Sequence, residues 1–261
     1  MGGDPVTFEY DADGLLTRAG ELNLTRDPAH GLIARTDVAG ITGTQRHNDF
    51  GELAEREFLV NGGELYGTTY TRDALGRIIE KTETVDGTAI TETYTYDETG
   101  RLTEVHRNGT LAHRYTYDAN GNRTRHDSAA GITTADYDAQ DRLTRYGDQT
   151  YSYNAAGDLT EKTAPEGTTT YDYDATGNLR QVNLPDGAEL EYLIDGQDRR
   201  IGKQVDGELQ QGWLYRDQLN PLAQTDGEGN ITHRFIYGEQ GHVPSYMVKD
   251  GQTSQLRQFK P

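Results

Sequence analysis

Hydrophobic and polar residues alternate along most of this chain, which is the pattern of half-buried β-strands. Runs with the 3.6-residue period of an amphipathic helix are absent. In Tyr94-Thr95-Tyr96, for example, the two rings lie at i and i+2 and so share one face of a strand. The alternation predicts a sheet with one face rich in Tyr, Leu and Val and an opposite face rich in Thr, Glu, Arg and Gln.

One motif recurs where these strands are expected to end. Two tyrosines separated by one residue are followed by Asp or Asn, two variable residues, Gly, a polar residue and Leu. The Asp side chain can accept a hydrogen bond from the backbone N–H two residues on, and Gly adopts a positive φ at little cost. We therefore predict strand, turn and strand at each copy. The residues expected to carry this structural repeat are Tyr94, Tyr96, Asp97, Gly100, Tyr115, Tyr117, Asp118, Gly121, Tyr151, Tyr153, Gly157, Tyr171, Tyr173, Asp174 and Gly177.

Looser copies extend the motif from Tyr10-Asp11 to Tyr237-Gly238 and give about twelve units at a period of roughly 16–25 residues, the range of repeat proteins. A second set of turns lies between them, and Asn-Gly and Asp-Gly favour two-residue type I′ hairpins. The second set comprises Asp86-Gly87, Asn108-Gly109, Asp186-Gly187, Asp206-Gly207, Asp226-Gly227 and Asp250-Gly251.

Two turns per unit predict an all-β fold, a long antiparallel meander of stacked hairpins. About 24 strands at roughly 4.8 Å each make a ribbon about 115 Å long. Because sheets of this length twist, we expect the ribbon to coil into a curved or spiral form.

Composition narrows the range of partners. The chain has 25 Lys and Arg against 43 Asp and Glu, a net charge of −18, which argues against nucleic acid or an anionic membrane as a partner. It contains no Cys, and its first residues lack the basic and apolar segments of a signal peptide. No run of 18 apolar residues is present, so no membrane-spanning helix is expected.

No catalytic, cofactor-binding or metal site is predicted. The seven histidines lack zinc-like spacing, although His106 and His113 lie on opposite arms of one predicted hairpin. His126-Asp127-Ser128 contains the residue types of a catalytic triad, but adjacent residues cannot adopt triad geometry. Asp97, Asp118 and Asp174 are interpreted as turn caps. The alternative is calcium, for which Asp11–Gly14 and Asp226–Asn230 would supply oxygen ligands.

The tyrosine rows have two interpretations. Tyrosines repeated at every period are expected to pack across strands as a structural ladder. Aromatic rings beside Asp and Asn also suit sugar stacking and hydrogen bonding, so a carbohydrate-binding or cell-surface adhesion module is the alternative function.

The Tyr-x-Tyr-Asp-x-x-Gly-Arg/Asn-Leu unit resembles the YD-repeat, or Rhs-repeat, family over nearly the whole chain. Residues 213–249 look like the part of bacterial Rhs proteins that precedes their conserved core domain. The resemblance implies a structural module without enzymatic activity, part of a β-sheet shell that in relatives encloses a C-terminal toxin polypeptide. Similar shells occur in the C components of insecticidal toxin complexes and in teneurin-type cell-surface proteins. It implies a secretion-associated, secreted or cell-surface location and, as partners, the remaining shell and its cargo.

Three segments are expected: degenerate repeats or an N-terminal cap at 1–70, regular repeats at 71–212, and C-terminal repeats at 213–261 that lead toward the missing core domain, with Gln252–Pro261 fraying. The family's core signature and aspartyl cleavage site do not appear, so the sequence is interpreted as a fragment. A cargo domain of ~100 residues is about 34 Å across and needs about 140 Å of ribbon per turn. We therefore expect less than one turn around such a cargo and two open edge strands suited to self-association.

Overall fold

The computed structural model describes residues 5–238, 241–249 and 252–255, and every regular element in these ranges is a β-strand. The predicted all-β class is therefore confirmed. The strands are β1 (Phe8–Tyr10), β2 (Leu16–Ala19), β3 (Leu22–Arg26), β4 (Ile33–Val38), β5 (Ile41–His47), β6 (Leu53–Val60), β7 (Gly63–Arg72), β8 (Ile78–Val85), β9 (Thr88–Tyr96), β10 (Leu102–Arg107), β11 (Thr110–Tyr117), β12 (Arg123–Ser128), β13 (Gly131–Tyr137), β14 (Leu143–Tyr146), β15 (Gln149–Tyr153), β16 (Leu159–Ala164), β17 (Gly167–Tyr173), β18 (Leu179–Asn183), β19 (Glu189–Ile194), β20 (Arg200–Val205), β21 (Glu208–Tyr215), β22 (Pro221–Thr225), β23 (Ile231–Tyr237), β24 (Pro244–Lys249) and β25 (Gln252–Gln255).

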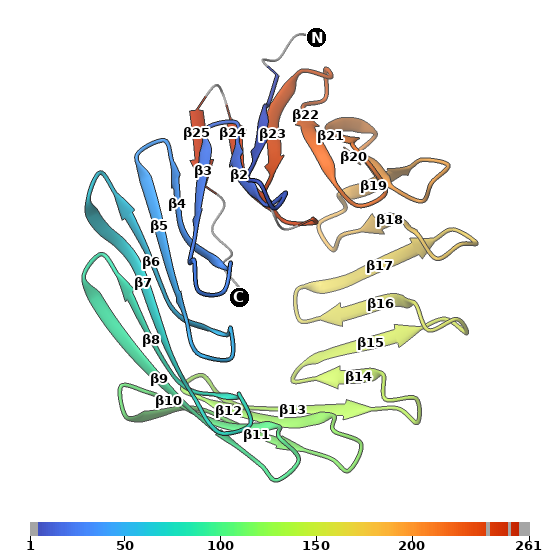
Figure 1. Cartoon of the computed structure of the whole chain (residues 1–261). Coiled ribbons are helices and arrows are strands. Elements are labelled where there is room, and N and C mark those ends of the chain that lie inside the picture. Colours follow the sequence, from blue (N-terminus) through green and yellow to red (C-terminus); the bar gives the residue numbers. More distant parts are fainter. Residues whose placement is uncertain (1–4, 239–240, 250–251, 256–261) are drawn as a thin grey trace.

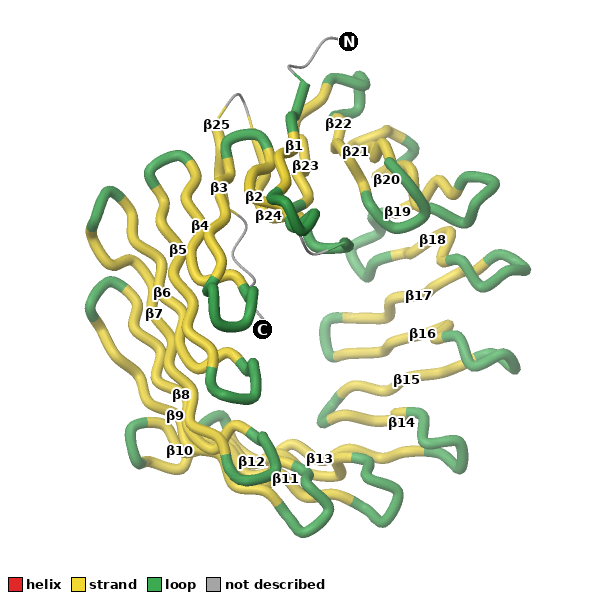
Figure 2. The backbone as a smooth tube through the Cα atoms, viewed as in Figure 1, coloured by secondary structure: helices red, strands yellow, loops and turns green. Residues whose placement is uncertain are grey.

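The strands form one continuous meander. Each strand pairs in antiparallel orientation with the next along the chain, from β1–β2 through β12–β13 to β24–β25. Figure 1 shows this ribbon coiled into a ring, and Figure 2 shows the turns along its two rims. Among the described residues no helix long and apolar enough to cross a membrane is found.

The two faces of the sheet differ in the predicted way. On β9 the side chains of Tyr94 and Tyr96 are half-buried, whereas the intervening Thr95 is exposed. Tyr94 lies beside Val105 of β10, and Val105 lies beside His113 of β11, so apolar and aromatic groups continue across neighbouring strands. This half-buried tyrosine face extends across strands because equivalent positions pair at each step.

The tyrosine-aspartate turns share one geometry, illustrated by Asp97–Gly100. The Gly100 N–H donates to the Asp97 carbonyl at 3.0 Å, and the Asp97 N–H donates to the Arg101 carbonyl at 2.9 Å. Gly100 has φ +85°, a left-handed conformation that costs glycine little. The following ladder is bulged at Thr103, whose hydroxyl donates to the Thr95 carbonyl. This bulge resets the register so that the tyrosine face stays continuous.

The second rim is less uniform than expected. Asp86-Gly87, Asn108-Gly109 and Asp206-Gly207 have a positive φ at both residues, as type I′ turns require. At Asp186-Gly187 and Asp226-Gly227 the prediction of a type I′ turn is wrong. In these turns the positive φ falls on Gly187 alone and on Gly229, because each turn has extra residues and closes like a tyrosine-aspartate turn. Asp250-Gly251 lies outside the described residues.

The two ends of the ribbon pack against each other. Leu22, 1% exposed, and Ala19, fully buried, belong to a cluster with Ile236 and Tyr246 from the other end of the chain. The Tyr246 hydroxyl donates to the Ala19 carbonyl at 3.2 Å. In Figure 1 the N-terminal strands β2 and β3 accordingly lie beside β23 and β24. We call this contact the seam; its buried members are Leu16, Ala19, Leu22, Leu24, Val38, Ile236 and Tyr246.

The seam contradicts the expectation that the two ends of the ribbon lie apart. The packing of β2 and β3 against β23 and β24 was not expected, because the predicted curvature assumed a cargo larger than this ring. Within the described residues β1 pairs only with β2 and β25 only with β24, so packing rather than a shared ladder closes the ring. The predicted fraying is wrong for Gln252–Gln255, which pairs with β24; residues 256–261 lie outside the described residues.

We predict that Leu22→Ala lowers the free energy of unfolding by about 2–5 kcal/mol, because it leaves a cavity in the seam. Leu75 is 77% exposed, so Leu75→Ala should change it by no more than ~0.5 kcal/mol. Denaturant titration monitored by circular dichroism measures both. Equal effects of the two substitutions would show that the seam contributes nothing to stability.

Candidate functional site

Each tyrosine-aspartate turn is closed by its carboxylate. In the turn at Asp97, one carboxylate oxygen accepts the backbone N–H groups of Thr99 and Arg101 at 3.0 and 2.9 Å. The other accepts the Arg101 Nε at 2.7 Å. The i→i+2 hydrogen bond expected from the sequence is thus joined by an i→i+4 bond. One side chain consequently satisfies two backbone donors and orients an arginine.

That arginine connects each turn to the next turn on the same rim. Adjacent turns are separated by two strands, about 10 Å, a gap that one arginine and one tyrosine can span. The Arg101 guanidinium lies 5.0 Å from the ring centroid of Tyr117, and its Nη1 donates to the Asp118 carbonyl at 3.0 Å. The Tyr117 hydroxyl donates back to the Leu102 carbonyl at 2.6 Å. Asp97, Arg101 and Tyr117 therefore form one bracket between successive turns.

The same bracket recurs along the ribbon. In each case an aspartate holds an arginine four residues later, the arginine lies over the tyrosine of the next turn, and the tyrosine hydroxyl bonds to a backbone carbonyl. The complete sets are Asp73–Arg77–Tyr96, Asp97–Arg101–Tyr117, Asp138–Arg142–Tyr153 and Asp195–Arg199–Tyr215.

At two turns where asparagine replaces the arginine, an aspartate of the next turn accepts its amide hydrogen bond. The Asn122 amide donates to the carboxylate of Asp141 at 2.7 Å, and the Asn178 amide donates to that of Asp198 at 3.0 Å. Asp141 and Asp198 take the place of the turn glycine, with φ +59° and +58°. A left-handed non-glycine residue costs about 1–2 kcal/mol, which the inter-turn hydrogen bond offsets.

The structure places the predicted repeat tyrosines on one face but gives them different partners. Two of the first tyrosines bond within their own strand, Tyr94 to Glu92 and Tyr151 to Gln149. The second reaches the preceding unit, as in Tyr117 and Tyr153. Tyr173 is the exception. It faces a unit that carries Asp158 instead of arginine, and its hydroxyl bonds to no described residue.

The hydrogen bonds of the turns stabilise the ionised aspartates. The Thr176 hydroxyl and the Asn178 N–H lower the pKa of Asp174 to about 2. The Arg142 guanidinium likewise lowers the pKa of Asp138, and the Arg101 N–H and Thr99 hydroxyl lower the pKa of Asp97. The native turns therefore favour the charged form of these carboxylates.

His113 lies close to a histidine of the next hairpin rather than to the one on its own hairpin. His113 Nδ1 lies 2.9 Å from His126 Nε2 on β12, not beside His106, whose ring contacts Glu104. Burial, the neighbouring His113 and Arg123 lower the pKa of His126. The residues of His126-Asp127-Ser128 do not converge, because Asp127 lies on the opposite face and pairs with Arg125 at 2.6 Å.

Metal ligation has no support in the described part of the chain. No group of three or more His, Cys, Asp or Glu side chains there is arranged to hold an ion. In the two segments considered for calcium, the carboxylates of Asp11 and Asp226 accept backbone N–H groups of their own turns instead.

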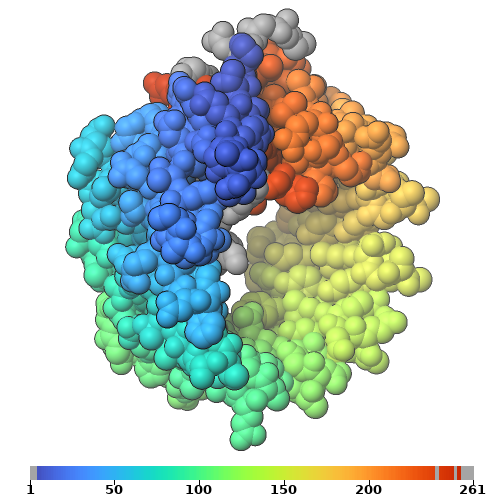
Figure 3. All heavy atoms as spheres, viewed as in Figure 1, coloured from blue at the N-terminus to red at the C-terminus, as the bar shows by residue number. Residues whose placement is uncertain are grey.

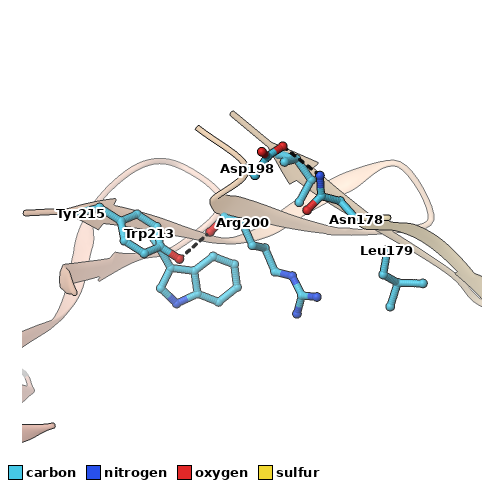
Figure 4. Close-up of a pocket in the computed structure, with 7 residues that line it drawn as sticks. Asn178, Leu179, Asp198, Arg200, Trp213 and Tyr215 are labelled. Atoms are coloured by element: carbon cyan, nitrogen blue, oxygen red, sulfur yellow. Dashed lines mark hydrogen bonds between the residues drawn. The ribbon is translucent and has the colours of Figure 1, made fainter. Parts of the chain in front are cut away.

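A cavity of about 390 Å³ lies beside Trp213. In Figure 4, Trp213, Arg200 and Leu179 project from the same side of the ribbon, while Asn178 and Asp198 are hydrogen-bonded to each other at its rim. The Tyr215 hydroxyl donates to the Arg200 carbonyl at 2.9 Å and fixes one wall. Aromatic, cationic and amide groups thus surround one space.

Sequence reasoning missed the arginines of the brackets and the Trp213 cavity. The sequence motif described these arginines only as polar residues that follow the turn; they are Arg77, Arg101, Arg142 and Arg199. Their constant spacing of four residues after an aspartate was the available signal. The cavity depends on three successive hairpins, so no local motif indicates it.

Comparison with known proteins agrees with this architecture. The family model described as Teneurin YD-shell matches residues 5–255. Human teneurin-4 is 31% identical over 109 residues, which cover 40% of this chain and 4% of the human protein, and mouse teneurin-4 gives the same values. This chain therefore spans a small fraction of the length of these relatives.

Two solved structures share the fold. A TcdB2-TccC3-Cdc42 structure superimposes with a TM-score of 0.54 at 15% identity and covers 95% of this chain and 20% of that chain. A TcdB2-TccC3 structure gives 0.50 at 14% identity, covering 94% and 18%. At these identities the likeness concerns the fold.

We predict that Tyr117→Phe destabilises the protein by about 1 kcal/mol, because the hydrogen bond to the Leu102 carbonyl is lost. Tyr115 is the matched control, since its hydroxyl bonds to no described residue. Thermal unfolding of Tyr117→Phe and Tyr115→Phe makes the comparison, and equal melting temperatures would contradict the bracket's role.

Acidification should destabilise the fold in two stages. Burial lowers the pKa values of His47 and His126 below 6.5, so the unfolded chain takes up these protons first and stability falls as the pH drops below 6.5. The folded pKa of Asp174, about 2, lies below its ordinary 3.8, so its contribution is lost as the pH falls from 3.8 toward 2. Melting temperatures across pH measure both stages.

The double variant His47→Gln/His126→Gln separates the two stages. It should lose the first fall in melting temperature and retain the second, because the turn carboxylates are unchanged. An unaltered first stage in this variant would assign that stage to other groups.

Proposed function

Because the chain belongs to the Teneurin YD-shell family, we propose that it forms part of the wall of a β-sheet shell that encloses a polypeptide. The family is one of structural shell domains, and the fold here is a single-layer sheet wound into a ring. The seam is the observation that supports enclosure most strongly, because it closes the ring with the chain's own ends. Figure 3 shows the hollow at the centre of the viewed face.

The size of the ring limits its contents. The 25 strands of the described residues, at about 4.8 Å each, give a circumference of about 120 Å and a mid-sheet diameter of ~38 Å. Subtracting half the ~10 Å packing distance on each side leaves ~28 Å. A compact domain of ~100 residues is about 34 Å across. The ring therefore suits an extended or unfolded polypeptide, and a folded domain would need further strands.

Curvature favours the tyrosine face as the inner face. Side chains crowd on the concave side of a bent sheet and spread on the convex side, and the tyrosine face is the more buried one. Most second tyrosines of the pairs also use their hydroxyls for backbone bonds, as Tyr96 and Tyr117 do. This supports the structural ladder over sugar binding by whole rows. Because these hydroxyls are engaged in structural hydrogen bonds, they also favour a structural role of the chain over a catalytic one.

Protease protection of a joined polypeptide tests enclosure. An unstructured C-terminal extension with one site for a sequence-specific protease should be cleaved more slowly on this chain than on an unrelated soluble domain. Equal cleavage rates would contradict enclosure. Sedimentation of the same samples distinguishes protection inside one ring from protection by self-association through β1 and β25, the other partner we propose.

A further inference from the structure

We propose that the cavity beside Trp213 binds an acidic sugar residue, a pyranose ring that carries a carboxylate. The site is formed by β18, β19, β20 and β21 and the turns that join them, and so lies away from the seam. Its volume of about 390 Å³ is within the range of small-molecule sites. Three kinds of group face this volume, and each matches a part of such a ligand.

Arg200 supplies the charge. In a chain with 43 acidic residues, its guanidinium pairs with no carboxylate among the described residues. It lies 3.8 Å from the ring centroid of Tyr192 and is held there by the aromatic face. Neighbouring Arg199 differs, since Asp195 occupies its guanidinium. An oriented, exposed arginine without a carboxylate partner among the described residues is suited to two parallel hydrogen bonds with a ligand carboxylate.

Trp213 supplies the stacking surface. It is the single tryptophan of the chain and is half-buried on β21. Its indole N–H has no acceptor among the described residues. The indole therefore offers an apolar face to the C–H side of a sugar ring and a donor to a hydroxyl or ring oxygen. In Figure 4 it projects beside the Arg200 guanidinium, so one ligand can reach both.

The rim supplies hydroxyl partners of fixed orientation. Asn178 donates to Asp198 at 3.0 Å and also to the Thr176 hydroxyl at 2.8 Å. These bonds leave the second Asp198 oxygen as an acceptor for a sugar hydroxyl. A flexible acidic peptide has carboxylates for Arg200 but no ring face or vicinal hydroxyls to match Trp213 and Asp198. Arg200, Trp213 and Asp198 together therefore favour an acidic sugar over an acidic peptide as the ligand.

Tryptophan fluorescence, excited at wavelengths that tyrosine does not absorb, reads this site alone, because Trp213 is the only tryptophan. Titration with a hyaluronan oligosaccharide, which contains glucuronic acid, should give a saturable change. With the chain's net charge of −18, general attraction of a polyanion cannot explain such a response. The absence of a saturable change would overturn the proposal.

Variants and competing ligands sharpen the test. Arg200→Gln should weaken binding about tenfold or more, since a charge-assisted bidentate contact is lost. Arg123→Gln is the matched control. Arg123 also lies over a tyrosine, Tyr115, without a described carboxylate partner, and it lies outside the cavity. This variant should bind like the unaltered protein.

Arg200→Lys keeps the charge and should bind with intermediate affinity, which guards against a folding defect in Arg200→Gln. Equal binding of a neutral chitin oligosaccharide would overturn the acidic specificity. Equal binding of a short glutamate-rich peptide would contradict the assignment of a sugar ligand and indicate an acidic peptide instead. Unchanged affinity in Arg200→Gln would overturn the role of Arg200.

Discussion

The arginine–tyrosine contact between successive turns is the interaction on which the rest of this structure depends. A single-layer sheet has no second layer against which to bury its surface, and only 33% of the residues are hydrophobic. The ladders hold each hairpin to its neighbour but leave the rim free to splay. The contact of Arg101 with Tyr117, anchored by Asp97, fixes the spacing at the rim and so the curvature. Curvature brings the ends together and permits the seam.

Much of the fold follows from local chemistry. The alternation, the Asp caps and the glycines at positive φ specify strands and turns one hairpin at a time. For that reason the meander and the family resemblance were predictable from residues such as Asp97 and Gly100. The exact turn class was less predictable. Asp226-Gly227 has the residues of a type I′ turn, but Gly229 two positions later offers a longer closure that also caps the Asp226 carboxylate.

The features that could not be predicted from the sequence are those that combine residues far apart along the chain. The seam joins Leu22 to Tyr246, more than two hundred residues apart, and no periodic signal encodes that contact. The cavity at Trp213 combines side chains from three hairpins for the same reason. The brackets are intermediate between the local turns, which were predictable, and these long-range contacts, which were not. Their spacing is regular, but their purpose is visible only when neighbouring turns are placed about 10 Å apart.

The paired substitutions at Asn122 with Asp141 and at Asn178 with Asp198 make the order of the units meaningful. The units that carry Asn122 and Asn178 are matched to an aspartate in the following unit, whereas the units that carry the bracket arginines are matched to a tyrosine ring. Deleting, duplicating or shuffling one hairpin would therefore bring together neighbours that do not match, although every hairpin would remain intact. The repeat units are therefore not interchangeable, because the contacts of each unit depend on which unit follows it.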